Sequence, residues 1–95
     1  MTVGVAHVTI SVPWVHSLKE KRSVVKSLCG RARNGFNISI AEVDARDLHQ
    51  SVVLGFACVC ADASSCDSVI DHVLNFIGEN TAGEIIGVER ELISG

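Results

Sequence analysis

The sequence predicts a fold of the α+β class, with four strands and two helices in the order β-α-β-β-α-β. Residues 2–12 alternate between apolar and polar side chains, which is typical of a strand buried on one face. Residues 17–33 and 64–77 each carry an apolar stripe at helical spacing. Residues 52–61 are apolar without alternation, which is typical of a central strand that is covered on both faces.

The first strand and the first helix are defined by the residues at their ends. Pro13 ends the strand, because proline lacks the amide donor that a sheet ladder needs. We expect Ser17 to cap the helix and Glu20, three residues later, to complete a capping box. Asn34-Gly35 should end this helix, with the glycine in the left-handed conformation of a C-cap.

The remaining elements complete the sandwich. Residues 36–45 form a second strand, in which Glu42 and Asp44 share a face with two isoleucines, as suits an edge strand. The second helix begins at Asp62 or Ser64 and ends over residues 78–83, and residues 84–93 form the last strand. Two right-handed βαβ units joined in this order give a ferredoxin-like sandwich, in which a four-stranded antiparallel sheet carries two helices on one face. We expect residues 1–95 to be one such domain.

The sheet face without helices should also be apolar, because the third strand is apolar on both faces. The mean hydropathy of +0.35 is high for so short a chain, whose core is thin. Surplus apolar surface is often covered by a second copy. The sequence therefore predicts a homo-oligomer formed through the open sheet face. A ligand on that face, or an exposed apolar strip, would also account for the pattern.

Residues 1–13 lack the basic start and the apolar block of a signal peptide. The longest apolar run, Val52 to Ala61, is about half the length that a membrane helix needs. We therefore expect a cytoplasmic protein that does not contact a membrane.

The four cysteines suggest small buried side chains more than a metal site. They are Cys29, Cys58, Cys60 and Cys66. Cys58 and Cys60 share one face of a strand, but no second pair of cysteines or histidines completes a zinc site. No metal and no cofactor are expected.

No catalytic constellation is recognisable. Glu42, Asp44 and Asp47 would form a metal or acid–base cluster with His49 if they met, but no nucleophile accompanies them. No phosphate-binding glycine loop or nucleophile elbow is present, and the glycine-rich anion loop of an acylphosphatase is missing. We expect a protein that is not an enzyme.

One stretch of the third strand partly matches the strand with which RNA-recognition domains of this topology stack bases. Leu54-Gly55-Phe56-Ala57-Cys58-Val59 keeps the glycine and one ring, but it lacks the leading basic residue and the second ring. The first strand has no aromatic residue either, so the match is interpreted as chance.

The segment His16-Ser17-Leu18-Lys19-Glu20-Lys21-Arg22 opens a basic helix in a chain whose net charge is −3. Lys19, Arg22, Lys26 and Arg33 fall within an arc of about 60° on the helical wheel. Cations in the first turn of a helix are disfavoured by its dipole, by up to about 1 kcal/mol each, so stability does not explain them. Lys and Arg around free amide groups are what phosphate binding needs. A solvated face that balances the acids elsewhere in the chain is the alternative.

Three blocks of sequence carry a family resemblance. They are residues 16–22 followed by Val24-Val25-Lys26-Ser27-Leu28, Phe36 to Ala45 with Asp47-Leu48, and Leu54-Gly55 in the third strand. In this order they resemble the YlxP-like family of small bacterial proteins, a domain of unknown function with a ferredoxin-like fold. Genes of this family often lie beside translation and ribosome-maturation genes, which implies a role near RNA or the ribosome. Trp14 and the cysteines depart from the residues usual in the family and inherit no role.

The sequence therefore predicts a non-enzymatic cytoplasmic module that binds RNA or a ribosome-associated partner through its first helix. The predicted phosphate contacts are Lys19, Lys21, Arg22 and Lys26, and Arg33 extends the row. Such contacts position a nucleic acid without reading its sequence. The alternative is a regulatory domain that binds a small molecule, or a purely structural oligomer.

Overall fold

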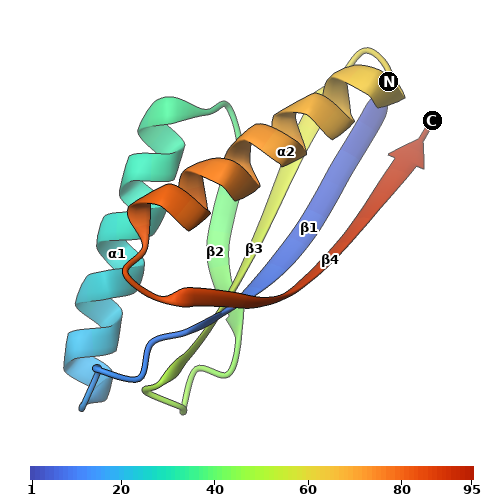
Figure 1. The fold of residues 1–95 in the computed structure, drawn as a ribbon. Coiled ribbons are helices and arrows are strands. Elements are labelled where there is room, and N and C mark those ends of the chain that lie inside the picture. Colours follow the sequence, from blue (N-terminus) through green and yellow to red (C-terminus); the bar gives the residue numbers. More distant parts are fainter.

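The computed structural model describes all 95 residues and contains six elements. They are β1 (Thr2–Ser11), α1 (Leu18–Gly35), β2 (Ser39–Asp44), β3 (Ser51–Cys60), α2 (Ala63–Asn80) and β4 (Glu84–Ser94). The strands form one antiparallel sheet in the order β2-β3-β1-β4, and both helices lie on the same face of it (Figure 1). This confirms the predicted ferredoxin-like sandwich, with β1 and β3 in the centre.

The core lies between the sheet and the two helices. Every second residue of β1 and β3 is buried, which is the period expected when one face of a sheet is covered. Seventeen buried apolar residues form one cluster there. The residues that the helices contribute to it are Leu28, Cys29, Ala32, Cys66, Ile70, Val73 and Ile77. The apolar stripes recognised in the sequence therefore do face the sheet.

The helix starts follow the predicted capping, with one difference. The Ser17 hydroxyl oxygen accepts the N–H of Glu20 at 3.1 Å, but the side chain of Glu20 makes no return bond to Ser17. Only half of the expected capping box is therefore formed. At α2, the cap is Asp62, whose carboxylate accepts the N–H of Ser65 at 2.7 Å. Of the two predicted starts of this helix, Asp62 and Ser64, the structure therefore shows the first.

The helix ends differ from the prediction. Helix α1 runs through Gly35, and no glycine in the chain has a positive φ, so the predicted left-handed C-cap is wrong. The helix ends instead at Phe36, whose backbone is extended and whose N–H donates to the Ala32 carbonyl. The ring of Phe36 packs edge-on against that of Phe76 in α2, at 5.6 Å between centroids. Strand β2 begins at Ser39, three residues later than predicted.

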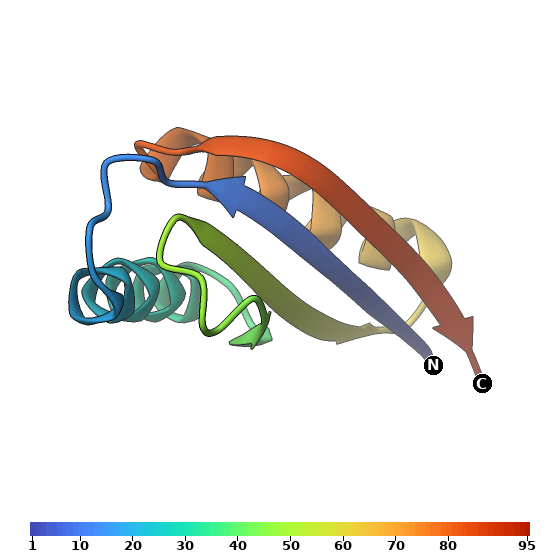
Figure 2. The ribbon, with the colours of Figure 1, turned by 90° about the horizontal axis from the view of Figure 1, so that it is seen from below.

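The two ends of the chain lie side by side at one end of the sheet (Figure 2). The amide of Gly95 donates to the Met1 carbonyl at 3.0 Å, which continues the pairing of β1 with β4. The connection between β2 and β3, residues 45–50, lies at the opposite end of the sheet (Figure 1).

Candidate anion-binding groove

Helix α1 carries its basic side chains along the edge of β2. Lys19, Arg22, Lys26 and Arg33 are all exposed. The last three line a groove of about 330 Å³ between α1 and β2. Lys19 lies one turn before Arg22, outside the lining of this groove. The row predicted from the helical wheel is thus present on the surface, and one side of it faces a concave site.

Arg46 is a basic residue of this site that the sequence pattern did not single out. It lies in the connection after β2 and lines the same groove as Arg22, Lys26 and Arg33. The predicted topology could have indicated this position. Strand β2 is the edge strand nearest α1, and it ends close to the start of that helix. We call the lining set of Arg22, Lys26, Arg33 and Arg46 the basic groove.

Lys21 is not part of the surface, which corrects its predicted role as a phosphate contact. The side chain is 1% exposed. Its Nζ donates to the carbonyls of Ala45 and Leu48, at 2.6 Å each. It also lies 2.7 Å from Oε2 of Glu42. Position 21 faces inward because it lies four residues before Val25 and seven before Leu28, on the apolar stripe of the helix. Its ammonium group therefore fastens the β2–β3 connection to α1 instead of meeting solvent.

The positive charge of the basic groove has no carboxylate partner. The ion pairs of the structure involve His7, Lys21 and Arg90 only. Glu42 lines the groove, but its carboxylate lies 2.7 Å from the ammonium of Lys21, which offsets its charge. Arg33 donates from Nη2 to the Ile40 carbonyl at 2.9 Å, which holds its guanidinium over β2. The groove therefore presents four cations, one of them fixed in place.

The predicted acidic cluster is not assembled as a metal or acid–base site. Glu42 pairs with Lys21, and the carboxylate of Asp44 accepts the N–H of Ala45 at 2.7 Å. Asp47 is exposed, and it does not meet Glu42, Asp44 and His49 as a group of ligands. Glu42 and Asp44 instead make local contacts at the connection, where Ala45 adopts a φ of 53°.

Neither Phe56 nor Trp14 offers an aromatic ring to the groove. Phe56 is buried among the core residues, so its ring is not offered to a base. Trp14 is 40% exposed, but it lines a depression on the other side of α1, together with Ser27 and Thr81. The partial match of β3 to an RNA-recognition strand therefore has no stacking surface.

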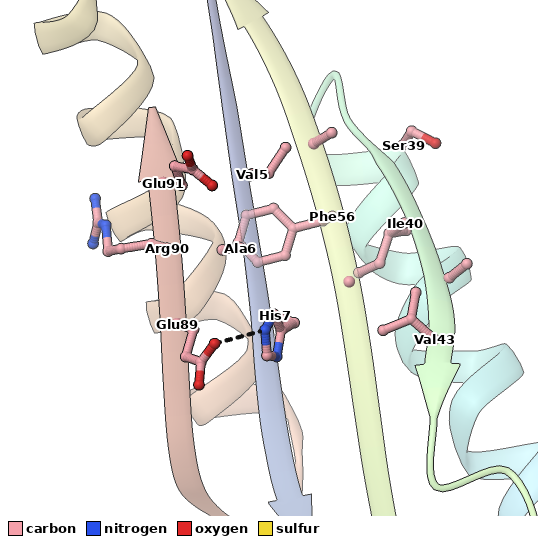
Figure 3. A pocket seen from close by; sticks show the side chains of 13 residues that line it. Val5, Ala6, His7, Ser39, Ile40, Val43, Phe56, Glu89, Arg90 and Glu91 are labelled. Atoms are coloured by element: carbon pink, nitrogen blue, oxygen red, sulfur yellow. Dashed lines mark ion pairs between the residues drawn. The ribbon is translucent and has the colours of Figure 1, made fainter. Parts of the chain in front are cut away.

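The open sheet face carries a second concave surface, of about 510 Å³. Its floor is low because Ala41, Gly55 and Ala57 have small or absent side chains. Figure 3 shows Val43 at one side of the hollow, and His7 and Glu89 at the other, joined by an ion pair of 3.1 Å. The face is thus mainly apolar over β2 and β3, while His7 of β1 and Glu89 and Glu91 of β4 make its other side polar.

The structure also brings together three of the four cysteines. The Sγ atoms of Cys58, Cys60 and Cys66 all lie within 4.8 Å of one another. The sequence placed the first two on one strand face, but it did not show that the first turn of α2 adds the third. Cys29 lies apart in α1, where burial raises the pKa of its thiol.

No helix in the structure is both long and apolar enough to cross a membrane.

Two comparisons of the amino-acid sequence with known proteins found matches. A family model described as "Protein of unknown function (DUF503)" matches residues 3–90. Over 61 residues the chain is 39% identical to "Uncharacterized protein YlxP" of Bacillus subtilis (strain 168), an alignment that covers 64% of this chain and 66% of that protein. The chain therefore spans just under two thirds of this relative.

Solved structures share the fold. A de novo designed protein with a ferredoxin fold matches all of this chain and 87% of its own, at 16% identity and a TM-score of 0.59. The flavoenzyme CrmK, described as involved in shunt product recycling in caerulomycin biosynthesis, matches 97% of this chain but only 19% of its own length, also at 16% identity and a TM-score of 0.59. Identities this low show a shared fold and nothing about activity.

Proposed function

Because the chain belongs to the DUF503 family, whose function is unknown, we propose a function from its own surface: a non-enzymatic cytoplasmic module that binds RNA, alone or in a ribosome-related assembly, through the basic groove and Lys19. The observation that carries the proposal is the absence of any carboxylate partner for these cations in a chain of net charge −3. The acids outnumber the bases, yet Arg22, Lys26 and Arg46 line one groove without a paired acid.

The groove suits phosphate groups because its donors come from two separate segments. Arg22 and Lys26 lie one turn apart on α1, and Arg46 reaches the same groove from the β2–β3 connection. A guanidinium presents a planar fork of donors that matches a phosphate. A single solvated helix face would not need a second segment to supply a cation.

The proposed interaction is electrostatic and independent of base sequence. No aromatic side chain lines the groove, so base stacking contributes nothing there. Phosphate contacts fix the position and orientation of a nucleic acid without reading its bases. RNA shape or a protein partner would then supply specificity.

Binding of a labelled single-stranded RNA, followed by fluorescence anisotropy at increasing salt, tests this function. Five phosphate contacts, at about −0.7 each, predict a slope of about −3.5 for the logarithm of the association constant against the logarithm of salt concentration. Replacing Arg22, Lys26 and Arg46 by Gln should reduce the slope by about 2. A slope near zero, or a slope unchanged in the triple variant, would contradict the proposal.

We also propose that the open sheet face packs against a second copy of the chain. Its exposed or half-buried apolar residues are Val3, Val5, Ala41, Val43, Val53, Ala57, Val59 and Ile93. Three strands of 10 or 11 residues and one of 6 residues, about 4.8 Å apart, span roughly 600 Å². A stable interface buries about 800 Å² on each partner, so this face is close to the required size.

Light scattering of the protein as it elutes from a size-exclusion column, at a range of concentrations, tests whether two copies associate. Ala57→Glu places a charge at the centre of the open face and should give a monomer, whereas Leu48→Glu, at an exposed site in the β2–β3 connection, should not. A wild-type monomer at all concentrations would contradict the dimer. If a neutral metabolite then raised the melting temperature, the hollow on the open face would be a ligand site, as the regulatory alternative requires.

A further inference from the structure

Three thiols form a compact cluster where β3 ends and α2 begins. Cys58 and Cys60 project from β3 toward the helices, and Cys66 projects toward them from α2. The Sγ atoms of Cys58 and Cys66 are 4.0 Å apart, and Sγ of Cys60 lies within 4.8 Å of both. Cys58 and Cys66 are buried, whereas Cys60 is half-buried at the mouth of the cluster.

We propose that this cluster binds one divalent d¹⁰ cation of the Zn²⁺ class through three thiolates, with a water as fourth ligand. Zinc–sulfur bonds of about 2.3 Å in a tetrahedral site put the sulfur atoms about 3.8 Å apart. The spacing of Cys58 and Cys66 is already close to this value, and Cys60 needs a movement of about 1 Å. The half-buried position of Cys60 gives a route for the ion and for the water.

A glycine in the neighbouring strand makes the room for these sulfur atoms. A Cβ atom at Gly4 would lie 3.1 Å from Sγ of Cys58 and 2.9 Å from the side chain of Ile70. Any other residue there would push Cys58 or Ile70 out of place. On the same side, the carbonyl oxygen of Thr2 accepts a hydrogen bond from the thiol of Cys66, at 3.4 Å. The cluster is thus bordered by backbone on one side and opens past Cys60 on the other.

A cation at the cluster has to displace the protons of its thiols, and a raised thiol pKa works against this exchange. Burial and the neighbouring thiol of Cys66 raise the pKa of Cys58, and the hydrogen bond with Cys66 raises the pKa of Cys60 to about 11. Without a metal these two thiols are therefore neutral at pH 7. A divalent cation replaces their protons and removes the repulsion between thiolates, so its binding should release protons.

The charge balance favours a divalent ion over a monovalent one. Three thiolates carry a charge of −3, which Zn²⁺ reduces to −1 and a monovalent ion such as Cu⁺ only to −2. Because Cys58 and Cys66 are buried, the smaller residual charge costs less desolvation. Sulfur ligands also exclude Mg²⁺ and Ca²⁺, which prefer oxygen.

Titration of the fully reduced chain with Co²⁺, as a coloured substitute for Zn²⁺, tests the site in the absence of oxygen. We expect one equivalent of Co²⁺ to give sulfur-to-metal charge-transfer absorption, which Zn²⁺ then abolishes by displacement. Cys60→Ser removes one ligand at a half-buried position and should weaken binding at least about ten-fold. In the wild type, but not in this variant, Zn²⁺ should raise the melting temperature.

Cys29→Ala is the matched control, because Cys29 is a buried cysteine that lies outside the cluster. It should leave the Co²⁺ spectrum and affinity unchanged, and circular dichroism should show that both variants fold. The proposal is overturned if the wild type gives no charge-transfer band, or if Cys60→Ser binds as tightly as the wild type. It is also overturned if the only thiol chemistry found is a Cys58–Cys66 disulfide in protein purified without reductant.

Discussion

The ammonium nitrogen of Lys21 lies 2.7 Å from Oε2 of Glu42, and both side chains are largely withdrawn from solvent. Oε2 has no aligned hydrogen bond, so this contact is a Coulombic ion pair, whereas the two bonds to the carbonyls of Ala45 and Leu48 are directional. A buried lysine is rarely tolerated unless it is paired in this way. The pair joins α1 to the strand edge that forms the other wall of the basic groove.

The first prediction concerns this pair. Lys21→Met keeps most of the side-chain volume but leaves a buried carboxylate and two carbonyls without their partner. We expect the free energy of unfolding, measured in urea, to fall by about 3–5 kcal/mol. Lys19→Met, at an exposed position two residues earlier, should change it by no more than about 0.5 kcal/mol. Equal effects of the two substitutions would show that the buried pair contributes no more than a surface charge.

A second prediction compares two glycines. A Cβ atom at Gly83 would lie 2.5 Å from the Ser11 carbonyl oxygen and 2.8 Å from the Ile10 side chain, where the backbone of β1 cannot yield easily. Gly83→Ala should therefore destabilise the fold by about 1–3 kcal/mol. Gly30 lies inside α1 with no atom within 4 Å of such a Cβ, so Gly30→Ala should stabilise it by about 0.5–1 kcal/mol. Thermal unfolding of the two variants should show opposite shifts.

The third prediction concerns acid stability at the start of α2. The hydrogen bond from the Ser65 amide holds the pKa of Asp62 below its ordinary value of about 3.9. The ionised carboxylate therefore stabilises the fold above the unfolded-state pKa, and this contribution is lost as pH falls through the folded-state pKa. Asp62→Asn retains a neutral cap. The difference in unfolding free energy between wild type and Asp62→Asn should be largest at neutral pH and vanish in strong acid; a constant difference would contradict the charge effect.

A fourth prediction separates the basic groove from basic charge in general. Arg46 lines the groove, whereas Arg31 lies on α1 with its guanidinium bonded to Asn80 and close to the ring of Phe76. Arg46→Gln should therefore weaken RNA binding and make the salt slope shallower by about 0.7. Arg31→Gln, with the same change of charge, should leave the slope as it is. If both variants weakened binding alike, the net charge of the chain would matter and the groove would not.

The fold was predictable because its signals are local and repeated. The stripe of α2 and the alternation of β1 each repeat over several residues, and the apolar β3 identified a central strand. Boundaries were less predictable, since α1 continues through Gly35 where tertiary packing of Phe36 on Phe76 overrides the turn signal. The candidate sites were less predictable than the fold, because they are formed by residues that lie far apart in the sequence. Neither the burial of Lys21 nor the approach of Cys66 to the two strand cysteines is visible in a single segment.

The bonds of Lys21 to Ala45 and Leu48 span 24 and 27 residues of sequence. A contact of this range forms only after the intervening chain has closed into a loop, which costs conformational entropy. During synthesis from the N-terminus, the residues of α1 are added before Arg46, so the early chain carries the basic row without the groove. The second wall is completed only when β2 pairs with β3 and Lys21 locks their connection in place. A nascent chain would therefore complete the basic groove in one late step, with the closing of the sheet edge.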